Sequence, residues 1–393
     1  MKGLAGETGA ARVVPCAAVR ILVDYRPALR ERTGVGEYVH ELVRAYTSLP
    51  DARGDDVRLF TSSWKDRPAP GLGRELRATV VDRRVPVRAL NYLWHRLEWP
   101  PVEAVAGKAD VVHALHPLLI PARAAAQVIT VHDLFFLSNP ERTRDEIRRD
   151  YPELAARHAG RADAIATPSA YTAGQVTRTL GVSADRIQVC PPGAPSWTSL
   201  GRGPHVPSDG YILFLSTLEP RKNVGGLLDA FELVVARKTR VPRLVLAGRA
   251  TADSREWLDR IGRAPLAGRV EHRGYVGAAN REALFAGARL LVMPSLDEGF
   301  GLPVLESMSA GVPVIASRRG ALPEVLGDAG PLVDPRDPRG LAEAIERMIE
   351  DEPYARACAQ AGLDRAAAFS WTRTAGLVRQ MYEAAIERRR ARA

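Results

Sequence analysis

PSLDEGFGLPVLESMSAGVPVIAS, residues 294–317, is the stretch that decides the fold of this chain. An apolar run, 290–293, leads into it and is typical of a β-strand. Pro303 stands where a helix would begin, the position at which a missing N–H costs least, and Gly311 is placed to end that helix. The run PVIAS then starts another strand. This order predicts a strand–loop–helix–strand unit of a parallel α/β sheet, which is a common place for ligand sites.

Two carboxylates bracket the glycine-rich loop of this unit. Glu298 stands in the loop and Glu306 stands inside the predicted helix. Helical side chains lean toward the N-terminus, so Glu306 should point at the pocket that Glu298 borders. The loop residues between them are Gly299, Phe300, Gly301 and Leu302. Their free N–H groups and the helix dipole suit an anion, although two acids near a helix start are also mildly favourable without any ligand.

Short apolar runs alternate with helical patterns along the rest of the chain, which indicates βαβ units. In the first half, the strand candidates are 19–25, 57–62, 79–81, 110–115, 127–133, 162–169 and 186–193. In the second half, they are 211–217, 243–248, 269–274, 288–295, 313–317 and 330–335. Helices are expected near 224–237, 254–262, 279–286, 303–310 and 338–350.

The length of 393 residues predicts two domains, because single cores seldom grow beyond roughly 250–300 residues. The segment 193–210 is rich in Gly, Pro and Ser and lacks periodicity, as linkers do. The expected division is a disordered leader 1–18, a Rossmann-like domain 19–195, a linker 196–210, a second Rossmann-like domain 211–370, and a C-terminal amphipathic helix 371–393.

Composition narrows the class of protein. Three widely spaced cysteines argue against a disulfide framework and a zinc site, and they fit a reducing, cytoplasmic location. The absence of an 18-residue apolar stretch predicts no transmembrane helix. The net charge of +9 is compatible with a basic proteome, an anionic ligand or an anionic membrane. The basic residues are scattered and do not alternate with aromatic residues, so no nucleic-acid partner is expected.

A second candidate site is STLEPRKNVGGLLDAF, residues 216–231. Arg221 and Lys222 precede a helix that begins near Val224, with Asn223 as the expected N-cap. Two cations at a helix N-terminus oppose the macrodipole, so an anionic ligand such as a diphosphate would offset an unfavourable arrangement. The alternative is a solvated turn in which both cations face water.

Two further segments are weak signals when taken alone. His132 emerges at the carboxyl end of an apolar strand, the side where ligands bind in open α/β sheets, although a lone histidine there is more often structural. Asp133 would cap the following segment or fix the imidazole tautomer. Gly34 and Gly36 open a helix, so backbone could approach a ligand closely, but the dinucleotide-binding pattern is incomplete.

Taken together, these segments resemble the retaining glycosyltransferases of the GT-B fold, family GT4. The resemblance runs from Val19 to Ile386. It is carried by EGFGLPVLE, LEPRKN and GVPVIAS, by the PEV of ALPEVLGDAG, and by the Ser-x-x-Thr of PSAYT. It implies two Rossmann-like doubly wound parallel-sheet domains with an interdomain cleft. The N-terminal domain would bind the acceptor, the C-terminal domain would bind the nucleotide sugar, and the final helix would pack back on the N-terminal domain.

The family's roles carry over to the matching positions. Arg221 and Lys222 would bind the donor diphosphate, and Glu306 would accept hydrogen bonds from the ribose. Glu298 and the backbone of residues 299–302 would hold the donor sugar. The remaining matches are His132, which would reach the sugar from the N-terminal domain, and Gly34 and Gly36, whose loop would close over the phosphates.

The resemblance implies transfer of a hexose, with mannose favoured, from a GDP- or UDP-sugar without a metal or other cofactor. The acceptor would be a glycan, a lipid-linked molecule or a small molecule. A catalytically silent nucleotide-sugar-binding subunit and a GT-B epimerase or glycan synthase are the alternatives. Residues 140–161 have a basic helical face that would either contact an anionic membrane at its inner face or remain solvated.

Overall fold

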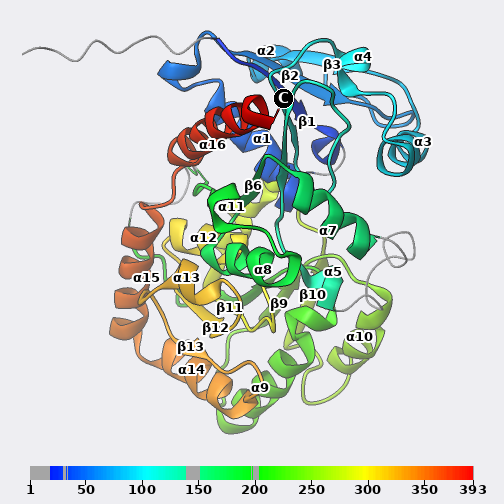
Figure 1. Ribbon diagram of the computed structural model, residues 1–393. Coiled ribbons are helices and arrows are strands. Elements are labelled where there is room, and N and C mark those ends of the chain that lie inside the picture. Colours follow the sequence, from blue (N-terminus) through cyan, green and yellow to red (C-terminus); the bar gives the residue numbers. More distant parts are fainter. Residues whose placement is uncertain are drawn as a thin grey trace, which may run out of the picture.

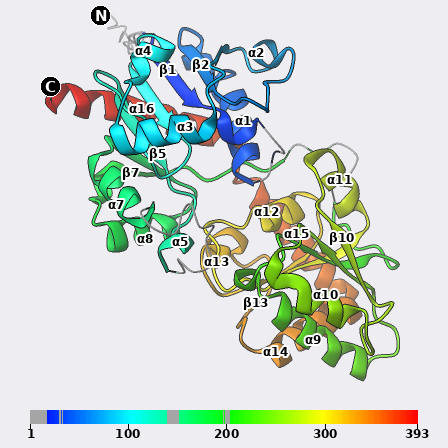
Figure 2. The same cartoon turned by 90° about the vertical axis from the view of Figure 1, so that its right-hand side faces the viewer.

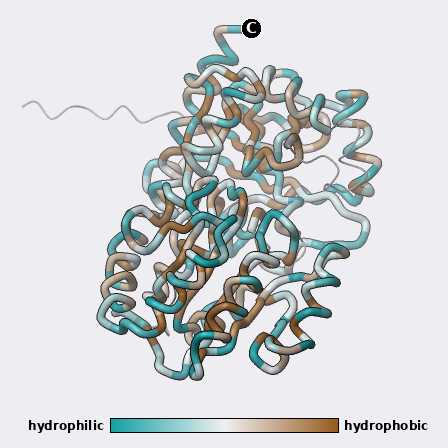
Figure 3. Tube along the Cα trace, turned by 90° about the horizontal axis from the view of Figure 1, so that it is seen from below, coloured by the Kyte–Doolittle hydropathy of each residue, from teal (hydrophilic) through white to brown (hydrophobic). Residues whose placement is uncertain are grey.

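The computed structural model describes residues 18–29, 32, 34–138, 151–195, 197 and 203–392. The expected leader therefore lies outside the described residues up to residue 17. Residues 196 and 198–202 of the expected linker and residues 140–150 of the basic segment also lie outside them. The described chain forms two α/β domains, one above the other in Figure 1, each with helices on both faces of its sheet. Apolar segments run through the middle of the molecule and hydrophilic ones lie mostly at its edges (Figure 3).

The N-terminal domain is built on a seven-stranded sheet with the order β3-β2-β1-β4-β5-β6-β7. All neighbouring strands are parallel. Its strands are β1 (Arg20–Asp24), β2 (Asp56–Thr61), β3 (Thr79–Asp82), β4 (Val111–Ala114), β5 (Ala126–Thr130), β6 (Ala164–Thr167) and β7 (Ile187–Val189). Its helices are α1 (Gly34–Tyr46), α2 (Leu72–Glu75), α3 (Val87–Tyr92), α4 (Val102–Ala106), α5 (Phe135–Ser138), α7 (Tyr151–Arg161) and α8 (Ala170–Leu180). The short helical turns are η1 (Arg26–Ala28), η2 (Pro50–Ala52), η3 (Leu93–Leu97) and η5 (Ala184–Arg186).

The C-terminal domain contains a six-stranded parallel sheet with the order β10-β9-β8-β11-β12-β13. Its strands are β8 (Tyr211–Leu215), β9 (Leu244–Ala247), β10 (Val270–Gly274), β11 (Ala288–Met293), β12 (Val314–Ser317) and β13 (Leu332–Val333). The helices that follow them are α9 (Val224–Arg237), α10 (Arg255–Ile261), α11 (Ala278–Ala286), α12 (Leu302–Ser309), α13 (Leu322–Leu326), α14 (Pro338–Glu350), α15 (Glu352–Ala366) and α16 (Trp371–Arg392), with turns η6 (Pro220–Lys222) and η7 (Ala252–Ser254).

The predicted fold class is confirmed, because both sheets are parallel and doubly wound. Every strand candidate in the sequence corresponds to a strand within a few residues, and most of these strands are short buried apolar runs, whereas β3, β7 and β10 are only partly buried. Helix α15 was not predicted from the sequence. The residues that it buries are mostly small, with Ala355, Ala359, Gly362 and Ala366 among them, so its core face has no periodic stripe of large apolar side chains.

The last helix, α16, leaves the C-terminal domain and lies on the N-terminal one. Figure 2 shows α16 beside α1, while α14 and α15 stay with the other domain. Its buried residues join the core that α1 and one face of the N-terminal sheet form. The Tyr382 hydroxyl also hydrogen-bonds His113 Nδ1 on β4 over 2.8 Å. This helix therefore fastens the end of the chain to the first domain.

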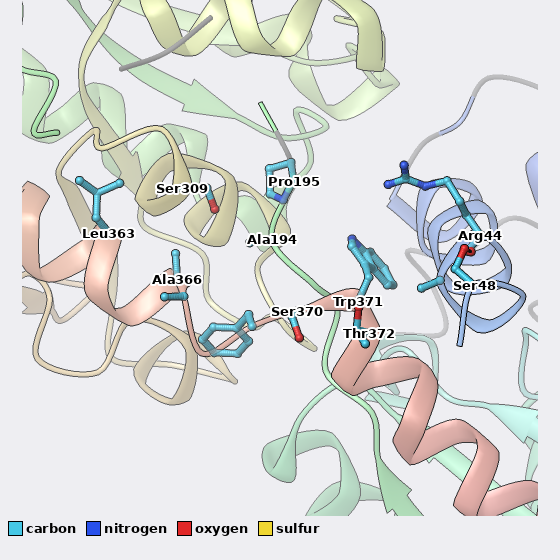
Figure 4. Close-up of a pocket in the computed structure, with 13 residues that line it drawn as sticks. Arg44, Ser48, Ala194, Pro195, Ser309, Leu363, Ala366, Ser370, Trp371 and Thr372 are labelled. Carbon is cyan, nitrogen blue, oxygen red and sulfur yellow. Dashed lines mark hydrogen bonds between the residues drawn. The ribbon is translucent and has the colours of Figure 1, made fainter. Parts of the chain in front are cut away.

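The chain crosses between the domains in two segments that run side by side. Ala194 N–H donates to the Phe369 carbonyl over 3.0 Å, and a Cβ on Gly193 would stand 2.2 Å from Trp371 N. A cavity of about 530 Å³ lies at this crossing (Figure 4). Arg44 of α1 and Ser48, which follows this helix, border it from the N-terminal domain.

Candidate functional site

A cavity of about 420 Å³ lies between the two domains. The N-terminal domain contributes the segment after β5 and the start of α1. The C-terminal domain contributes the segments after β8, β9, β10 and β11. Parallel strands place the residues that follow them at one edge of the sheet, so loops distant in sequence meet there. Of the residues predicted to form the site, His132, Gly34, Arg221, Lys222, Glu298, Gly299, Phe300, Gly301 and Leu302 line this cavity.

A buried ion pair forms part of the cavity wall. Lys222 Nζ donates to Glu298 Oε1 over 2.6 Å, and both side chains are more than nine-tenths buried. Ser295 Oγ donates to the same carboxylate oxygen over 2.8 Å. Burial alone would raise the pKa of Glu298, but the positive charges of Lys222 and Arg221 outweigh it and lower the pKa. Glu298 is therefore ionised at neutral pH.

Arg221 lies among three acids beside this pair. Its Nη1 is 3.9 Å from Glu298 Oε2 and 3.5 Å from Asp133 Oδ2, and its Nη2 is 3.1 Å from Glu219 Oε1. The guanidinium also stacks 4.8 Å from the centre of the Phe135 ring. Burial would lower the pKa of Arg221, but these carboxylates, Glu298 first, raise it. The two cations are thus buried and paired, which differs from the alternative of a solvated turn.

Asn223 does not cap α9 as the sequence predicts. It takes a left-handed conformation with φ of 56°, and its side chain makes no capping hydrogen bond. Its Nδ2 instead donates to the carbonyls of Pro294 and Pro335, over 3.2 and 2.6 Å. Asn223 therefore ties the cation-bearing turn to the segment that enters the glycine loop. The sequence pattern could not show this, because the partners lie 71 and 112 residues away.

His132 enters the cavity from the N-terminal domain. Its ring packs edge-on against Tyr38, with ring centres 5.2 Å apart. Burial lowers the pKa of His132 to about 4, against the opposing effects of Asp133 and a hydrogen bond to the Leu115 backbone. Nε2 has no hydrogen-bond partner among the described residues. A neutral imidazole with an available Nε2 can accept a hydrogen bond from a bound molecule.

Asp133 follows His132 and caps the next segment, one of the two roles that the sequence suggested. Its Oδ1 accepts from Phe135 N–H over 3.2 Å, while its Oδ2 faces Arg221.

The glycine loop makes close contact with the other domain. A Cβ on Gly299 would lie 2.0 Å from the His132 carbonyl oxygen, so no side chain fits there. Gly301 has a φ of 96°, and a Cβ there would meet Leu322 at 2.5 Å. Phe300 is buried and packs edge-on against Phe369. The loop therefore requires glycine at both positions. Gly299 is needed because no side chain fits, and Gly301 is needed because of both the lack of space and the positive φ.

The two glycines at the start of α1 have different surroundings. Gly34 borders the cavity, and a Cβ added to it would lie 3.6 Å from Leu302 Cδ1 of the other domain. Gly36 is not among the cavity-lining residues. A Cβ on it would stand 2.9 Å from the Pro27 carbonyl oxygen, so packing of α1 on η1 explains the glycine there.

Glu306 lies behind the loop, in a second cavity of about 230 Å³ that shares Tyr38, Arg281 and Leu302 with the first. One of its oxygens is paired with Arg281 Nη1, and Oε2 has no hydrogen-bond partner among the described residues. Glu37 of α1 also borders this second cavity. Burial, followed by Glu41, raises the pKa of Glu37.

Sequence reasoning missed several lining residues. Arg281 comes from α11 and Arg249 follows β9, and neither belongs to a recognisable pattern. The position of Arg249 just after a strand was the only sequence signal that pointed to it. No sequence signal pointed to Arg281. The main cavity is lined by four cations, Arg221, Lys222, Arg249 and Arg281, and by three carboxylates, Asp133, Glu219 and Glu298. The one-charge excess of cations favours an anionic ligand.

Among the described helices, none combines the length and the apolar composition needed to cross a lipid bilayer.

Comparison with known proteins assigns the family. Residues 32–196 match the model described as Glycosyltransferase Family 4, and residues 209–351 match the one described as Glycosyl transferases group 1. The O-antigen chain mannosyltransferase B of Escherichia coli is 31% identical over 379 residues, which cover 90% of this chain and 96% of that protein.

Solved structures show the same fold at low sequence identity. Sucrose-phosphate synthase from Thermosynechococcus elongatus has a TM-score of 0.71 and 20% identity, over 93% of this chain and 98% of that one. Anabaena HepE in complex with UDP and glucose has a TM-score of 0.67 and 18% identity, over 92% and 98%. The chain therefore belongs to the group 1 glycosyltransferases of family 4 and is a glycosyltransferase with the GT-B fold.

Proposed function

We propose that this enzyme transfers a hexose from a nucleotide-diphosphate sugar to an acceptor hydroxyl, with retention of anomeric configuration and without a metal ion. One observation carries the proposal. The buried cations Arg221 and Lys222, the available Nε2 of His132 and the glycine loop all border one interdomain cavity. These groups supply positive charge for a diphosphate and a hydrogen-bond acceptor for a sugar.

The diphosphate would take the place that carboxylates now hold around the cations. Lys222 and Arg221 donate hydrogen bonds to phosphate oxygens, and Glu298 is then free to accept hydroxyl hydrogen bonds from the sugar. In the same way, ribose hydroxyls compete with Arg281 for Glu306. Two preorganised cations at this cavity stabilise the charge that develops on the leaving diphosphate. This diphosphate is the base for the incoming hydroxyl, so no enzymic nucleophile is required.

Mannose is the proposed sugar and GDP or UDP the proposed nucleotide. The support is indirect: a relative 31% identical over most of the chain is named a mannosyltransferase, and a structural neighbour contains UDP and glucose. If Arg221 and Lys222 take the place of a divalent cation, the enzyme needs no metal ion for catalysis. Turnover should then be the same with and without a chelator such as EDTA.

The acceptor would bind in the N-terminal domain. A cavity of about 810 Å³ there is bordered by Arg26, Trp64, Asn91 and His116. Arg26 and His116 are both hydrogen-bonded to the buried Asp24, so the cavity floor is fixed. The Trp64 side chain is 74% exposed at its edge, and an open aromatic face of this kind can stack on a sugar ring. A glycan or lipid-linked glycan acceptor fits these features.

Contact with an anionic membrane remains part of the proposal. Arg161 of α7 pairs with Glu98 over 2.9 Å, which sets the described end of the basic segment beside Leu97 and Trp99. These two apolar side chains are 56% and 61% exposed. Arginines next to exposed aromatic and aliphatic side chains are typical of surfaces that contact lipid headgroups.

Liposome co-sedimentation tests the membrane contact. We expect binding to vesicles that contain phosphatidylglycerol, weakened by salt and by the double substitution Leu97→Ser, Trp99→Ser. The control, Leu296→Ser, removes an exposed apolar side chain from the other domain and should bind as the wild type does. Absence of salt-sensitive binding by the wild type would contradict the contact.

A thermal-shift screen over GDP- and UDP-sugars tests the donor. A ligand at about 100 times its Kd adds roughly 2.7 kcal/mol to the free energy of unfolding, which gives a measurable rise in melting temperature. The donor with the largest shift is then incubated with mannosylated oligosaccharides, and proton NMR of the first product reports the anomeric configuration. Retention is expected. A product with inverted configuration would overturn the proposed reaction course.

A further inference from the structure

Two segments without an assigned role meet across the domain interface. They are the Ser-x-x-Thr segment, 169–172, at the start of α8, and the Pro-Glu-Val segment, 323–325, in α13. The first belongs to the N-terminal domain and the second to the C-terminal domain. The first segment contacts the glycine loop that holds Glu298. The second segment lies in α13, which begins directly after Ala321, whose N–H supports that loop.

Two hydroxyl groups of the first segment bind one carbonyl of the glycine loop. Ser169 Oγ donates to the Gly299 carbonyl over 2.6 Å, and Thr172 Oγ1 donates to the same oxygen over 3.0 Å. Both side chains are fully buried. A backbone carbonyl of the C-terminal domain is thus satisfied by the N-terminal domain.

The second segment caps α8 from the opposite domain. The Glu324 carboxylate accepts from the N–H of Ala170 over 2.8 Å and from the N–H of Tyr171 over 3.1 Å. The first N–H groups of a helix have no partner within the helix, and the positive end of the dipole favours a carboxylate. A single glutamate therefore supplies a charged cap that only the closed arrangement of domains can provide.

The cap and the loop are connected within the C-terminal domain. Ala321 N–H, one residue before α13, donates to the Glu298 carbonyl over 2.9 Å. Gly299 in turn lies so close to the backbone of His132 that a Cβ would not fit between them. Moving the domains apart would break the bonds to Gly299 and Glu324 and would separate the glycine loop from His132.

We propose that Thr172, Ser169 and Glu324 are positioning residues that form a latch. The latch holds the domains closed and aligns the loop 298–301 with His132. This inference rests on the proposed function, because that loop and His132 are the groups assigned to the donor sugar. In the described structure, Arg221 and Lys222 make no hydrogen bond to Ser169, Thr172 or Glu324, so nucleotide binding and sugar alignment are separable.

Thr172→Val is the main variant, because it removes the hydroxyl and keeps the shape and the N–H of the residue. Thr172→Ser restores the hydroxyl. Thr177→Val is the matched control, the same substitution at an exposed position of the same helix. Glu324→Ala tests the cap, and the double variant Thr172→Val, Glu324→Ala removes the bonds that Thr172 Oγ1 and Glu324 make. It keeps the two Ser169 bonds, to the Gly299 carbonyl and to the Thr172 N–H.

Three measurements decide the matter. We expect kcat to fall about tenfold in Thr172→Val and further in the double variant, while the Kd for GDP or UDP, by titration calorimetry, changes less than twofold. Thr172→Ser should return to the wild-type kcat, and Thr177→Val should not differ from wild type. Small-angle X-ray scattering should show a larger radius of gyration for the double variant. Wild-type kcat in the double variant, or equal losses in kcat and nucleotide affinity, would overturn the latch.

Failure of the proposed function gives a different result. If the wild type binds no nucleoside diphosphate and transfers no sugar, the donor assignment is wrong. The scattering measurement then still tests the latch, because only a working latch makes the double variant more open than Thr177→Val. An unchanged radius of gyration would overturn it in that case.

Discussion

The pair formed by Lys222 and Glu298 is the residue-scale feature that best indicates a ligand site. Taking two charges out of water is costly, and a buried pair often contributes little net stability. Here the pair borders a cavity, with Arg221 shared among three acids around it. Such an arrangement holds two ordered cations beside the cavity, where we propose that an anion replaces the carboxylates.

Removing either cation should damage catalysis more than folding. Arg221→Ala and Lys222→Ala each remove a proposed donor to the leaving diphosphate, so kcat should fall about 10²–10³-fold, which corresponds to roughly 3–4 kcal/mol. Steady-state kinetics at saturating donor measures this effect. Arg237→Ala is the control, since this arginine sits at the solvent-exposed end of α9 in an ion pair with Glu346.

The loss of Lys222 also leaves the Glu298 charge without its nearest partner, so folding must be checked separately. Melting temperatures identify variants that fail to fold, and Lys222→Arg retains the charge. Near-normal turnover in folded Arg221→Ala and Lys222→Ala would show that these cations do not stabilise the leaving group.

At this scale the sequence predicted which side chains would gather but not how they pair. Glycine spacing and strand ends pointed to Glu298, Arg221 and His132, because parallel strands bring such positions to one edge. The Lys222–Glu298 bond joins residues 76 positions apart, and the Arg281–Glu306 pair joins two helices. No local pattern encodes contacts that depend on how two loops or two helices pack.

At the scale of elements, α16 has the most distinctive role. It carries a long apolar stripe, which predicts a helix that packs on another element. This stripe is buried against the N-terminal domain. Val378, Met381 and Tyr382 are almost fully buried there. Burying a large apolar side chain contributes about 1.5–3 kcal/mol, so this helix contributes substantially to the N-terminal domain.

Met381→Ala should therefore destabilise the N-terminal domain by about 2–5 kcal/mol, through lost burial and the cavity left behind. Chemical denaturation followed by circular dichroism measures the change. Glu387→Ala, at an exposed position of the same helix, should change stability by less than about 0.5 kcal/mol. Equal stability of Met381→Ala and Glu387→Ala would mean that α16 is only loosely attached.

Elements were predictable where their core residues are large and periodic. Most of the described strands are short buried runs with turn residues on either side, and α9 and α14 have clear apolar faces. Helix α15 buries small residues, and the π-helical turn η3 follows α3 without a boundary residue. Neither pattern differs enough from a loop or a continuous helix for the sequence to reveal it.

At the scale of the whole molecule, several histidines are buried as neutral rings. Burial lowers the pKa of His95 and His113 to about 3, and that of His132 and His158 to about 4. In the unfolded chain a histidine has a pKa of about 6.5. Between these values the unfolded state binds more protons than the folded one, so the stability falls as pH falls from about 6.5 toward 4.

We therefore expect a steep acid limb in stability. At pH 4.5 each of these histidines should cost roughly 2–3 kcal/mol relative to pH 7.5, since one pKa unit corresponds to about 1.4 kcal/mol. Asp24 extends this acid limb below about pH 4, where an unfolded aspartate begins to bind protons, because Arg26 and then His116 outweigh its burial and lower its pKa in the folded state. Melting temperatures across this range measure the effect. A melting temperature that is unchanged from pH 7.5 to 4.5 would contradict the neutral buried rings.

The two-domain architecture followed from length and from the repeated βαβ pattern, but the closed arrangement of the domains did not. The contacts that set it are polar and join distant residues, such as Ser169 and Thr172 with Gly299. Hydroxyl groups and glycines at these positions resemble ordinary loop residues in the sequence. Only the folded chain shows that they meet in direct contact at the domain interface.

The central claim is that the interdomain cavity binds a nucleotide-diphosphate sugar. A crystal structure of the enzyme with bound GDP-mannose or UDP-glucose tests it most directly. We predict diphosphate oxygens within hydrogen-bond distance of Arg221 and Lys222, ribose hydroxyls at Glu306, and the sugar between His132 Nε2 and the loop 298–301. A nucleotide sugar bound at another surface, with the Lys222–Glu298 and Arg281–Glu306 pairs intact, would contradict it.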